Sequence, residues 1–280
     1  MCICSAVERN LSAERAALRV HEVTVRFGGV VALDRVSLEV RRGEVLGVIG
    51  PNGAGKTTLF NVICGFAVPD AGTLTWREES IARMRPHRLT RLGIARTLQG
   101  VGLFERLTLL ENVMVGAERF RRSNALIGML GLPRADRDER ELCERALAAL
   151  ARLGCEGVAE RLPATLPYAV RKRAALARAL VAEPELLLLD EPAGGLDATE
   201  LSELAKVITA LGDTAVMVVE HHMDFVTSVC DRVVVLDFGR VIAAGPPPQI
   251  RQDPRVLDAY LGREAGEREA VLGEAADALG

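Results

Sequence analysis

The chain has 280 residues, of which 49% are hydrophobic and 26% charged, and its formal net charge is −3. This balance is typical of a globular protein with ample material for a core, and nothing in it indicates a nucleic-acid partner, which usually requires a basic surplus. No apolar run reaches the length of a membrane-spanning helix, and the first 18 residues lack the apolar core of a signal peptide. We therefore expect a cytosolic protein, or one that is peripheral to a membrane.

Strand and helix patterns alternate along most of the chain. Residues 45–49 are continuously apolar, which favours a strand buried on both faces of a parallel sheet. In chain order we expect strands at 18–27, 36–40, 45–49, 73–76, 186–189, 215–219 and 233–236. We expect helices at about 56–64, 140–153, 171–181, 199–211 and 223–230.

Helix signals dominate the middle of the chain, from about residue 108 to 154. The sequence therefore predicts an α/β core interrupted by a helical insertion, which we expect at about residues 93–160. Residues 1–16 are interpreted as an N-terminal extension, 17–262 as the main globular domain, and 263–280 as a C-terminal tail.

A phosphate-binding motif follows the buried strand at 45–49. The sequence Gly50-Pro51-Asn52-Gly53-Ala54-Gly55-Lys56-Thr57 matches the pattern G-x-x-x-x-G-K-[ST] in full. Its glycines let the backbone curl so that N–H groups and the following helix terminus form a nest for phosphate oxygens. We expect Lys56 to reach the β- and γ-phosphates, Thr57 to offer its hydroxyl to Mg²⁺, and Thr58 to add a phosphate contact. The alternative, a glycine-rich turn with a chance match, is disfavoured by the strand–loop–helix context.

Two acidic residues, Asp190 and Glu191, end the apolar run at 186–189. At the carboxyl end of a parallel strand, Asp190 would face the same crevice as the phosphate loop. We expect Asp190 to hold Mg²⁺ through water and Glu191 to polarise the attacking water. His221 follows another apolar strand and could contact a γ-phosphate, although alone it is interpreted as a surface histidine.

Together these motifs resemble an ABC ATPase subunit over about residues 18–262. The resemblance implies an α/β fold: a P-loop NTPase (RecA-like) core with an edge antiparallel β subdomain and an inserted α-helical subdomain, binding ATP and Mg²⁺. It also implies roles for residues outside the phosphate loop. Phe27 matches the adenine-stacking aromatic, Gln99 the glutamine that senses Mg²⁺ and γ-phosphate, and His221 the switch histidine. Gly195, Leu196 and Asp197, after Gly194, match the segment that contacts the second ATPase subunit.

Several further segments are similar to the ATPases of branched-chain amino acid importers, in particular the subunit with the longer helical insertion. They are Arg26–Gly29, Gly65–Phe66, Arg96–Gln99, Leu103–Phe104, Glu111–Val113 and Ala259–Gly262. The resemblance implies a second ATPase subunit in a hetero- or homodimer, two membrane permease subunits and, indirectly, a solute-binding protein. It implies a location at the cytoplasmic face of the cell (inner) membrane. Related branches handle urea or lipids, so the solute stays open.

A second reading is a non-transport ABC protein that acts as a nucleotide-gated binding or regulatory module, for example on nucleic acid or ribosomes. Such proteins usually carry two ATPase cassettes in one chain, or added zinc or basic elements. This chain has one cassette and none of those additions. The sequence therefore favours the transport ATPase.

The signature segment departs from the family. Where the family has Leu-Ser-Gly-Gly-Gln facing the partner's ATP, this chain has Leu166-Pro167-Tyr168-Ala169-Val170. Pro167 offers neither a hydroxyl nor an N–H, Ala169 adds a methyl group, and Val170 removes an amide. One hypothesis is an asymmetric dimer, in which this chain's own site is strong and the partner's site is impaired. The alternative is that the helix terminus and the Val170 N–H suffice at both sites.

Overall fold

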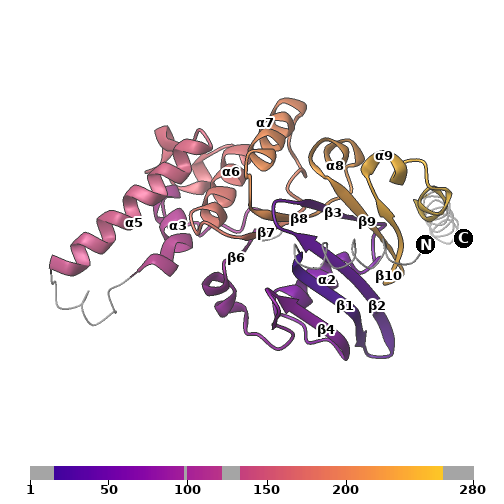
Figure 1. The fold of residues 1–280 in the computed structure, drawn as a ribbon. Helices are drawn as coiled ribbons and strands as arrows, with labels where there is room; N and C mark the ends of the chain where they lie inside the picture. The colour runs from indigo at the N-terminus through magenta and orange to yellow at the C-terminus, as the bar shows by residue number, and fades with distance from the viewer. Residues whose placement is uncertain (1–15, 98–99, 122–132, 261–280) are drawn as a thin grey trace, which may run out of the picture. The chain divides into compact units, whose positions relative to one another are not determined.

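The computed structural model describes residues 16–97, 100–121 and 133–260, which form two compact units (Figure 1). The first unit runs as far as Arg83 and resumes at Val219, and the second is Met84–Val218. The expected N-terminal extension, apart from Ala16, and the C-terminal tail lie outside the described residues.

The first unit contains an antiparallel sheet in the order β2-β1-β4-β5. Its strands are β1 (Ala16–Phe27), β2 (Val30–Arg41), β4 (Ala71–Trp76) and β5 (Glu79–Ser80). Gly28 and Gly29 join β1 to β2 with φ of 52° and 90°, the backbone that a tight two-residue hairpin requires. This sheet confirms the expected antiparallel β part of the fold.

Strand β2 is longer than the sequence predicts, because it begins at Val30 rather than at residue 36. Arg35 has φ 50°, and the pairing with β1 is irregular at this point. Leu33 and Val36 are buried while the residues between them are not, so the strict alternation by which a half-buried strand is recognised is broken.

The rest of the first unit forms the surroundings of the phosphate loop. Strand β9 pairs in parallel with β3 and antiparallel with β10, a strand that the sequence did not predict. All five residues of β3 are buried, as its continuous apolar run predicts. The bounds are β3 (Val45–Ile49), α2 (Lys56–Ile63), α8 (Met223–Val229), β9 (Arg232–Asp237), β10 (Arg240–Gly245) and α9 (Pro247–Ile250).

The second unit combines three strands with a group of helices. The strands β6 (Ile94–Arg96), β7 (Leu186–Asp190) and β8 (Ala215–Val219) lie in the order β8-β7-β6, and β6 is parallel to β7. Helices α3 (Leu109–Gly116), α5 (Pro133–Arg152) and α6 (Tyr168–Leu180) pack on one another, and α7 (Ala198–Thr209) follows β7. Short 3₁₀ turns lie at Pro86–Leu92, Ala117–Phe120, Glu156–Val158 and Pro163–Thr165. Among the described residues, no helix is both long and apolar enough to cross a membrane.

Two helices start earlier than the sequence predicts. Helix α5 begins at Pro133, and proline is well suited to the first turn of a helix. The first turns of α5 are rich in charged residues, so they lack the helical spacing of apolar residues by which a helix is recognised. Helix α6 begins at Tyr168 rather than at residue 171, immediately after Pro167. The segment compared with the family signature therefore includes the first turn of α6.

The Glu111-Asn112-Val113 motif has a local structural role at the start of α3. Thr108 and Glu111 form a reciprocal capping box. The buried Asn112 amide donates to the carbonyl oxygens of Phe104, Leu107 and Thr108, and its carbonyl oxygen accepts from the Phe104 N–H at 2.7 Å. These bonds satisfy backbone groups of the loop before α3 and thereby fix its path.

Candidate nucleotide-binding and hydrolysis site

The phosphate loop connects β3 to α2 in the first unit. Gly50, Gly53 and Gly55 have φ of 153°, 75° and 102°, which L side chains rarely adopt. A Cβ at Gly50 would lie 2.1 Å from the Leu236 carbonyl oxygen, and one at Gly55 would lie 2.6 Å from the Ala32 carbonyl oxygen. Gly50 and Gly55 are therefore required both for the backbone conformation and for the close approach of neighbouring strands, and Gly53 for the backbone conformation.

The turn between β9 and β10 is hydrogen-bonded to the phosphate loop. The Gly239 N–H donates to the Ala54 carbonyl oxygen at 3.0 Å, and the Gly239 carbonyl oxygen accepts from the Asp34 N–H at 2.8 Å. Asp34 also forms an ion pair with Arg240, and the hydrogen bond from Arg240 is the main cause that lowers the pKa of Asp34 below its usual value. Sequence reasoning missed this support, although the Phe238-Gly239 pair between two apolar runs is a turn signal.

The first turn of α2 presents the polar groups expected at a phosphate site. Lys56 Nζ donates to the carbonyl oxygens of Gly50 at 2.6 Å and Pro51 at 2.9 Å, so its ammonium group lies over the loop. Thr57 is exposed and Thr58 half-buried. The N-cap residue Gly55 supplies no side-chain hydrogen bond, so no side-chain cap competes with an anion for the first N–H groups of the helix.

Phe27 and His221 also belong to the first unit and have accessible rings. Phe27 is 55% exposed at the end of β1. The side chain of His221 is 53% exposed, and its backbone N–H donates to Oε2 of the fully buried Glu220 at 3.0 Å. The same oxygen lies 3.1 Å from Nδ1 of His222. Glu220 thus fixes the turn that carries both histidines, a role that the sequence analysis did not assign.

Asp190 ends β7 in the second unit and has a partner that the sequence analysis did not predict. Its Oδ2 lies 2.8 Å from Nη2 of Arg96, and the two side chains are 4% and 13% exposed. The Asp190 N–H donates to Thr97 Oγ1, and the Thr97 N–H donates to the Leu188 carbonyl oxygen. These bonds hold the ends of β6 and β7 together. Gln99, two residues beyond Thr97, lies outside the described residues.

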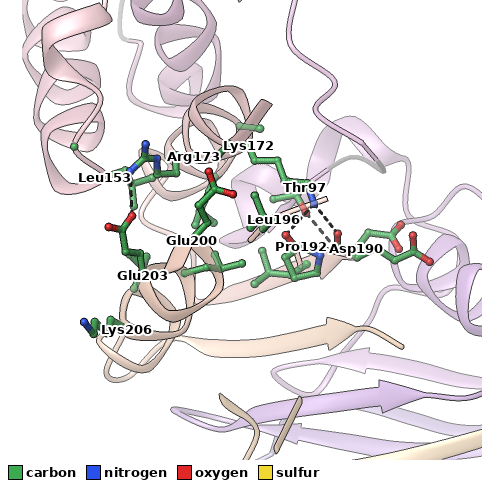
Figure 2. Close-up of a pocket in the computed structure, with 18 of the residues that line it drawn as sticks. Thr97, Leu153, Lys172, Arg173, Asp190, Pro192, Leu196, Glu200, Glu203 and Lys206 are labelled. Atoms are coloured by element: carbon green, nitrogen blue, oxygen red, sulfur yellow. Dashed lines mark hydrogen bonds and ion pairs between the residues drawn. The ribbon is translucent and has the colours of Figure 1, made fainter. Parts of the chain in front are cut away.

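Glu191 follows β7 in a left-handed conformation, with φ 47°. Such a backbone is uncommon for a residue other than glycine and indicates a sharp turn at the strand end. Asp190 and Glu191 border a cavity of about 320 Å³ that lies between α6 and α7, with Lys172, Leu196 and other residues in its wall (Figure 2).

The signature segment and the expected dimer-contact segment touch each other within the second unit. Pro167 is the N-cap of α6 and supplies no side-chain hydrogen bond, in contrast to the serine of the family. The Tyr168 ring lies against Gly195, whose φ is 75°, so closely that a Cβ there would approach Tyr168 Cε1 to 2.9 Å. Asp197 caps α7 through a reciprocal capping box with Glu200.

The residues of the signature segment differ in their exposure to solvent. Leu166 and Ala169 are buried, Val170 is half-buried, and Tyr168 is exposed. Leu196, between Gly195 and the cap residue Asp197, lines the cavity beside α7. The first turn of α6 is therefore held against the chain's own loop after β7.

The first unit thus holds the phosphate loop, Phe27 and His221, and the second holds Asp190, Glu191 and the signature segment. A glycine phosphate loop between a buried strand and a helix, with an Asp-Glu pair ending another buried strand, defines a phosphate-loop nucleoside triphosphatase. Within that class, the chain belongs to the ABC transporter family, whose model matches residues 33–194. It is the ATP-binding and ATP-hydrolysing subunit of such a transporter.

Curated relatives cover nearly the whole chain. It is 40% identical over 248 residues to the high-affinity branched-chain amino acid transport ATP-binding protein LivG of Salmonella typhimurium, covering 88% of this chain and 97% of the relative. It is 39% identical to BraF of Pseudomonas aeruginosa, covering 89% and 98%. Residues 240–266 also match a model described as branched-chain amino acid ATP-binding cassette transporter.

Solved structures agree with the fold. A nucleotide-free ATP-binding cassette from an ABC transporter matches with a TM-score of 0.76 and 29% identity, covering 88% of this chain and 98% of that chain. A dimeric, post-hydrolysis ATP-binding cassette bound to ADP and Pi matches with a TM-score of 0.68 and 26% identity, covering 82% and 98%.

The geometry around Gly50 leads to a first prediction. The substitution Gly50→Ala forces the Leu236 carbonyl to move. We therefore expect the free energy of unfolding to fall by about 2 kcal/mol and ATP binding to weaken. Gly157→Ala is the matched control, because a Cβ there meets nothing within 4 Å. Urea denaturation and equilibrium ATP binding measure both effects, and equal behaviour of the two variants would contradict the prediction.

Proposed function

We propose that the chain powers the import of branched-chain amino acids or related small solutes. The observation that carries this proposal is the match of residues 240–266, which lie beyond the general ATPase motifs, to the branched-chain amino acid family. The names of the similar proteins LivG and BraF support the same solute class. Urea and lipid systems are the alternatives that a transport assay would have to exclude.

Mg²⁺ is proposed as the metal of the site. Its preferred ligands are oxygen atoms, and Thr57 offers a hydroxyl at the start of α2 while Asp190 offers a buried carboxylate at the end of β7. Gln99 is a further oxygen ligand proposed from the family resemblance. When bound, Mg²⁺ would neutralise charge that develops on the phosphate oxygens during hydrolysis.

The phosphate-loop residues have the role of holding ATP. N–H groups of the loop between Asn52 and Thr58 and the Lys56 ammonium group bind the phosphates, and the exposed Phe27 ring stacks on the adenine. The lysine must exchange its loop carbonyl partners for phosphate oxygens, which are stronger acceptors because they are charged.

The hydrolytic step uses Glu191 as the general base. Its carboxylate accepts a proton from the attacking water while the oxygen of that water bonds to the γ-phosphorus and the bond to the ADP oxygen breaks. His221 donates to a γ-phosphate oxygen from a turn that the buried Glu220 fixes. The products are ADP and inorganic phosphate.

The proposed assembly is a dimer of ATPase subunits on two membrane permease subunits, at the cytoplasmic face of the membrane and served by a solute-binding protein. The dimeric cassette among the solved relatives supports the ATPase pair. Gly195–Asp197 contact the second ATPase subunit, and the helical insertion at about residues 93–160 passes the closing motion to the permeases.

The altered signature is proposed to make this dimer asymmetric. The signature of this chain serves the ATP of the second subunit, and Pro167 supplies no side-chain donor at the start of α6. A hydrogen bond to a charged group contributes roughly 1.5–3 kcal/mol, so its loss slows hydrolysis about ten- to a hundredfold if it acts in the transition state. The slow site is then the one that belongs to the second subunit.

The motor function predicts a specific pattern of ATPase activity. The purified chain should hydrolyse ATP slowly alone and faster when it is mixed with its partner subunit, because each site needs a signature from the other chain. Lys56→Ala should abolish the increase. A mixture that binds ATP but never hydrolyses it would support the nucleotide-gated binding module instead.

The asymmetry predicts that restoring the family signature in this chain raises the hydrolysis rate at the second subunit's site. In a heterodimer with Glu191→Gln, this chain's own site is inactive and only the second subunit's site remains. Adding Pro167→Ser, Ala169→Gly and Val170→Gln should raise the residual hydrolysis rate about ten- to a hundredfold. If the Glu191→Gln heterodimer keeps most of the wild-type ATPase activity, or the three substitutions change nothing, the asymmetry is wrong.

A further inference from the structure

The loop that follows β7 contains two left-handed residues, Glu191 with φ 47° and Gly195 with φ 75°. Glycine adopts this backbone freely, but a glutamate in it is strained by roughly 1–2 kcal/mol and persists only where its surroundings enforce it. The surroundings of Glu191 therefore decide where its carboxylate lies.

Lys172 of α6 lies at the centre of this loop. Its Nζ donates to the carbonyl oxygens of Glu191 at 3.1 Å, Pro192 at 2.9 Å and Gly194 at 2.5 Å. An ammonium group has three N–H donors, and three carbonyl oxygens that converge on one point repel one another unless a cation lies between them. The Lys172 side chain thus hydrogen-bonds to three carbonyl oxygens of the turn that begins at Glu191. Figure 2 shows Lys172 beside this turn.

Tyr168 holds the other end of the same loop. It lies one helical turn before Lys172 on α6, so both side chains leave the helix on one face. The ring packs against Gly195, and the Lys172 ammonium lies 5.4 Å from the ring centroid, within the range of a cation–π interaction. The first two turns of α6 therefore contact the loop at both ends, at Glu191 and at Gly195.

We propose that Lys172 is a positioning residue for ATP hydrolysis, which acts by holding the backbone of Glu191 in its left-handed conformation. The inference rests on the proposed role of Glu191 as general base. It adds that α6, whose first turn carries the signature for the second subunit's ATP, is bonded directly to the loop that serves this chain's ATP.

The test compares lysine variants in the assembled transporter. Lys172→Met removes the three donors and keeps the length of the side chain, so kcat for ATP should fall about tenfold or more while KM for ATP stays within about twofold. Lys172→Arg, which keeps the charge and the donors, should retain most of the activity. Lys206→Met is the matched control, because Lys206 is an exposed lysine of α7 that lines the same cavity.

A double variant distinguishes a positioning role of Lys172 from a general loss of structure. If Lys172 acts through the Glu191 carboxylate, Lys172→Met should cause no further loss in a transporter that already carries Glu191→Gln. A further tenfold loss in that background, or an unchanged kcat for Lys172→Met alone, would overturn the proposal. If Lys172→Met does not assemble, Lys172→Gln takes its place, and a wild-type kcat for that variant would equally overturn it.

Lys56→Ala distinguishes failure of this inference from failure of the proposed function. If Lys56→Ala leaves hydrolysis intact, the proposed motor function itself is wrong. If Lys56→Ala abolishes hydrolysis while Lys172→Met leaves kcat unchanged, only the role of Lys172 is wrong.

Discussion

The candidate site depends on two sharp backbone turns, each of which follows a buried strand. At the ends of β3 and β7 the backbone turns sharply, with φ of 153° at Gly50 and 47° at Glu191. After β3 the turn must bring N–H groups to an anion, and glycine meets this need without a side chain. After β7 the turn must present a carboxylate, so a residue with a side chain has to adopt a conformation that suits glycine better.

The two turns are consequently supported in different ways. Backbone groups support the phosphate loop: the Gly239 N–H donates to the Ala54 carbonyl oxygen, and neighbouring carbonyl oxygens leave no room for a Cβ at Gly50 or Gly55. Charged side chains support the acidic turn, where Arg96 pairs with Asp190 and Lys172 binds the carbonyl groups that follow. Loss of a glycine should therefore damage folding and binding together, whereas loss of a cation should affect mainly the acidic turn.

The sequence predicted the parts of the fold that depend on local patterns. Continuous apolar runs identified β3, β7 and β8, and the phosphate-loop pattern identified the strand–loop–helix around Lys56. It missed the support from Gly239, because a hydrogen bond between residues far apart in the chain leaves no periodic pattern. It missed β10 because the second half of this strand, Ala243-Ala244-Gly245, consists of residue types that are uncommon in strands. It also missed Arg96 and Lys172 as partners of the turn after β7, since such contacts are recognised only once two elements lie side by side.

The most direct test is a measurement of ATP bound and ATP hydrolysed in one turnover by the assembled transporter. Binding is assigned to the turn after β3 and hydrolysis to the turn after β7, so the two should be separable. We expect Glu191→Gln to retain bound ATP at this chain's site without cleaving it, and Lys56→Ala to retain none there. Cleavage of the retained ATP by Glu191→Gln at the wild-type rate would contradict the account.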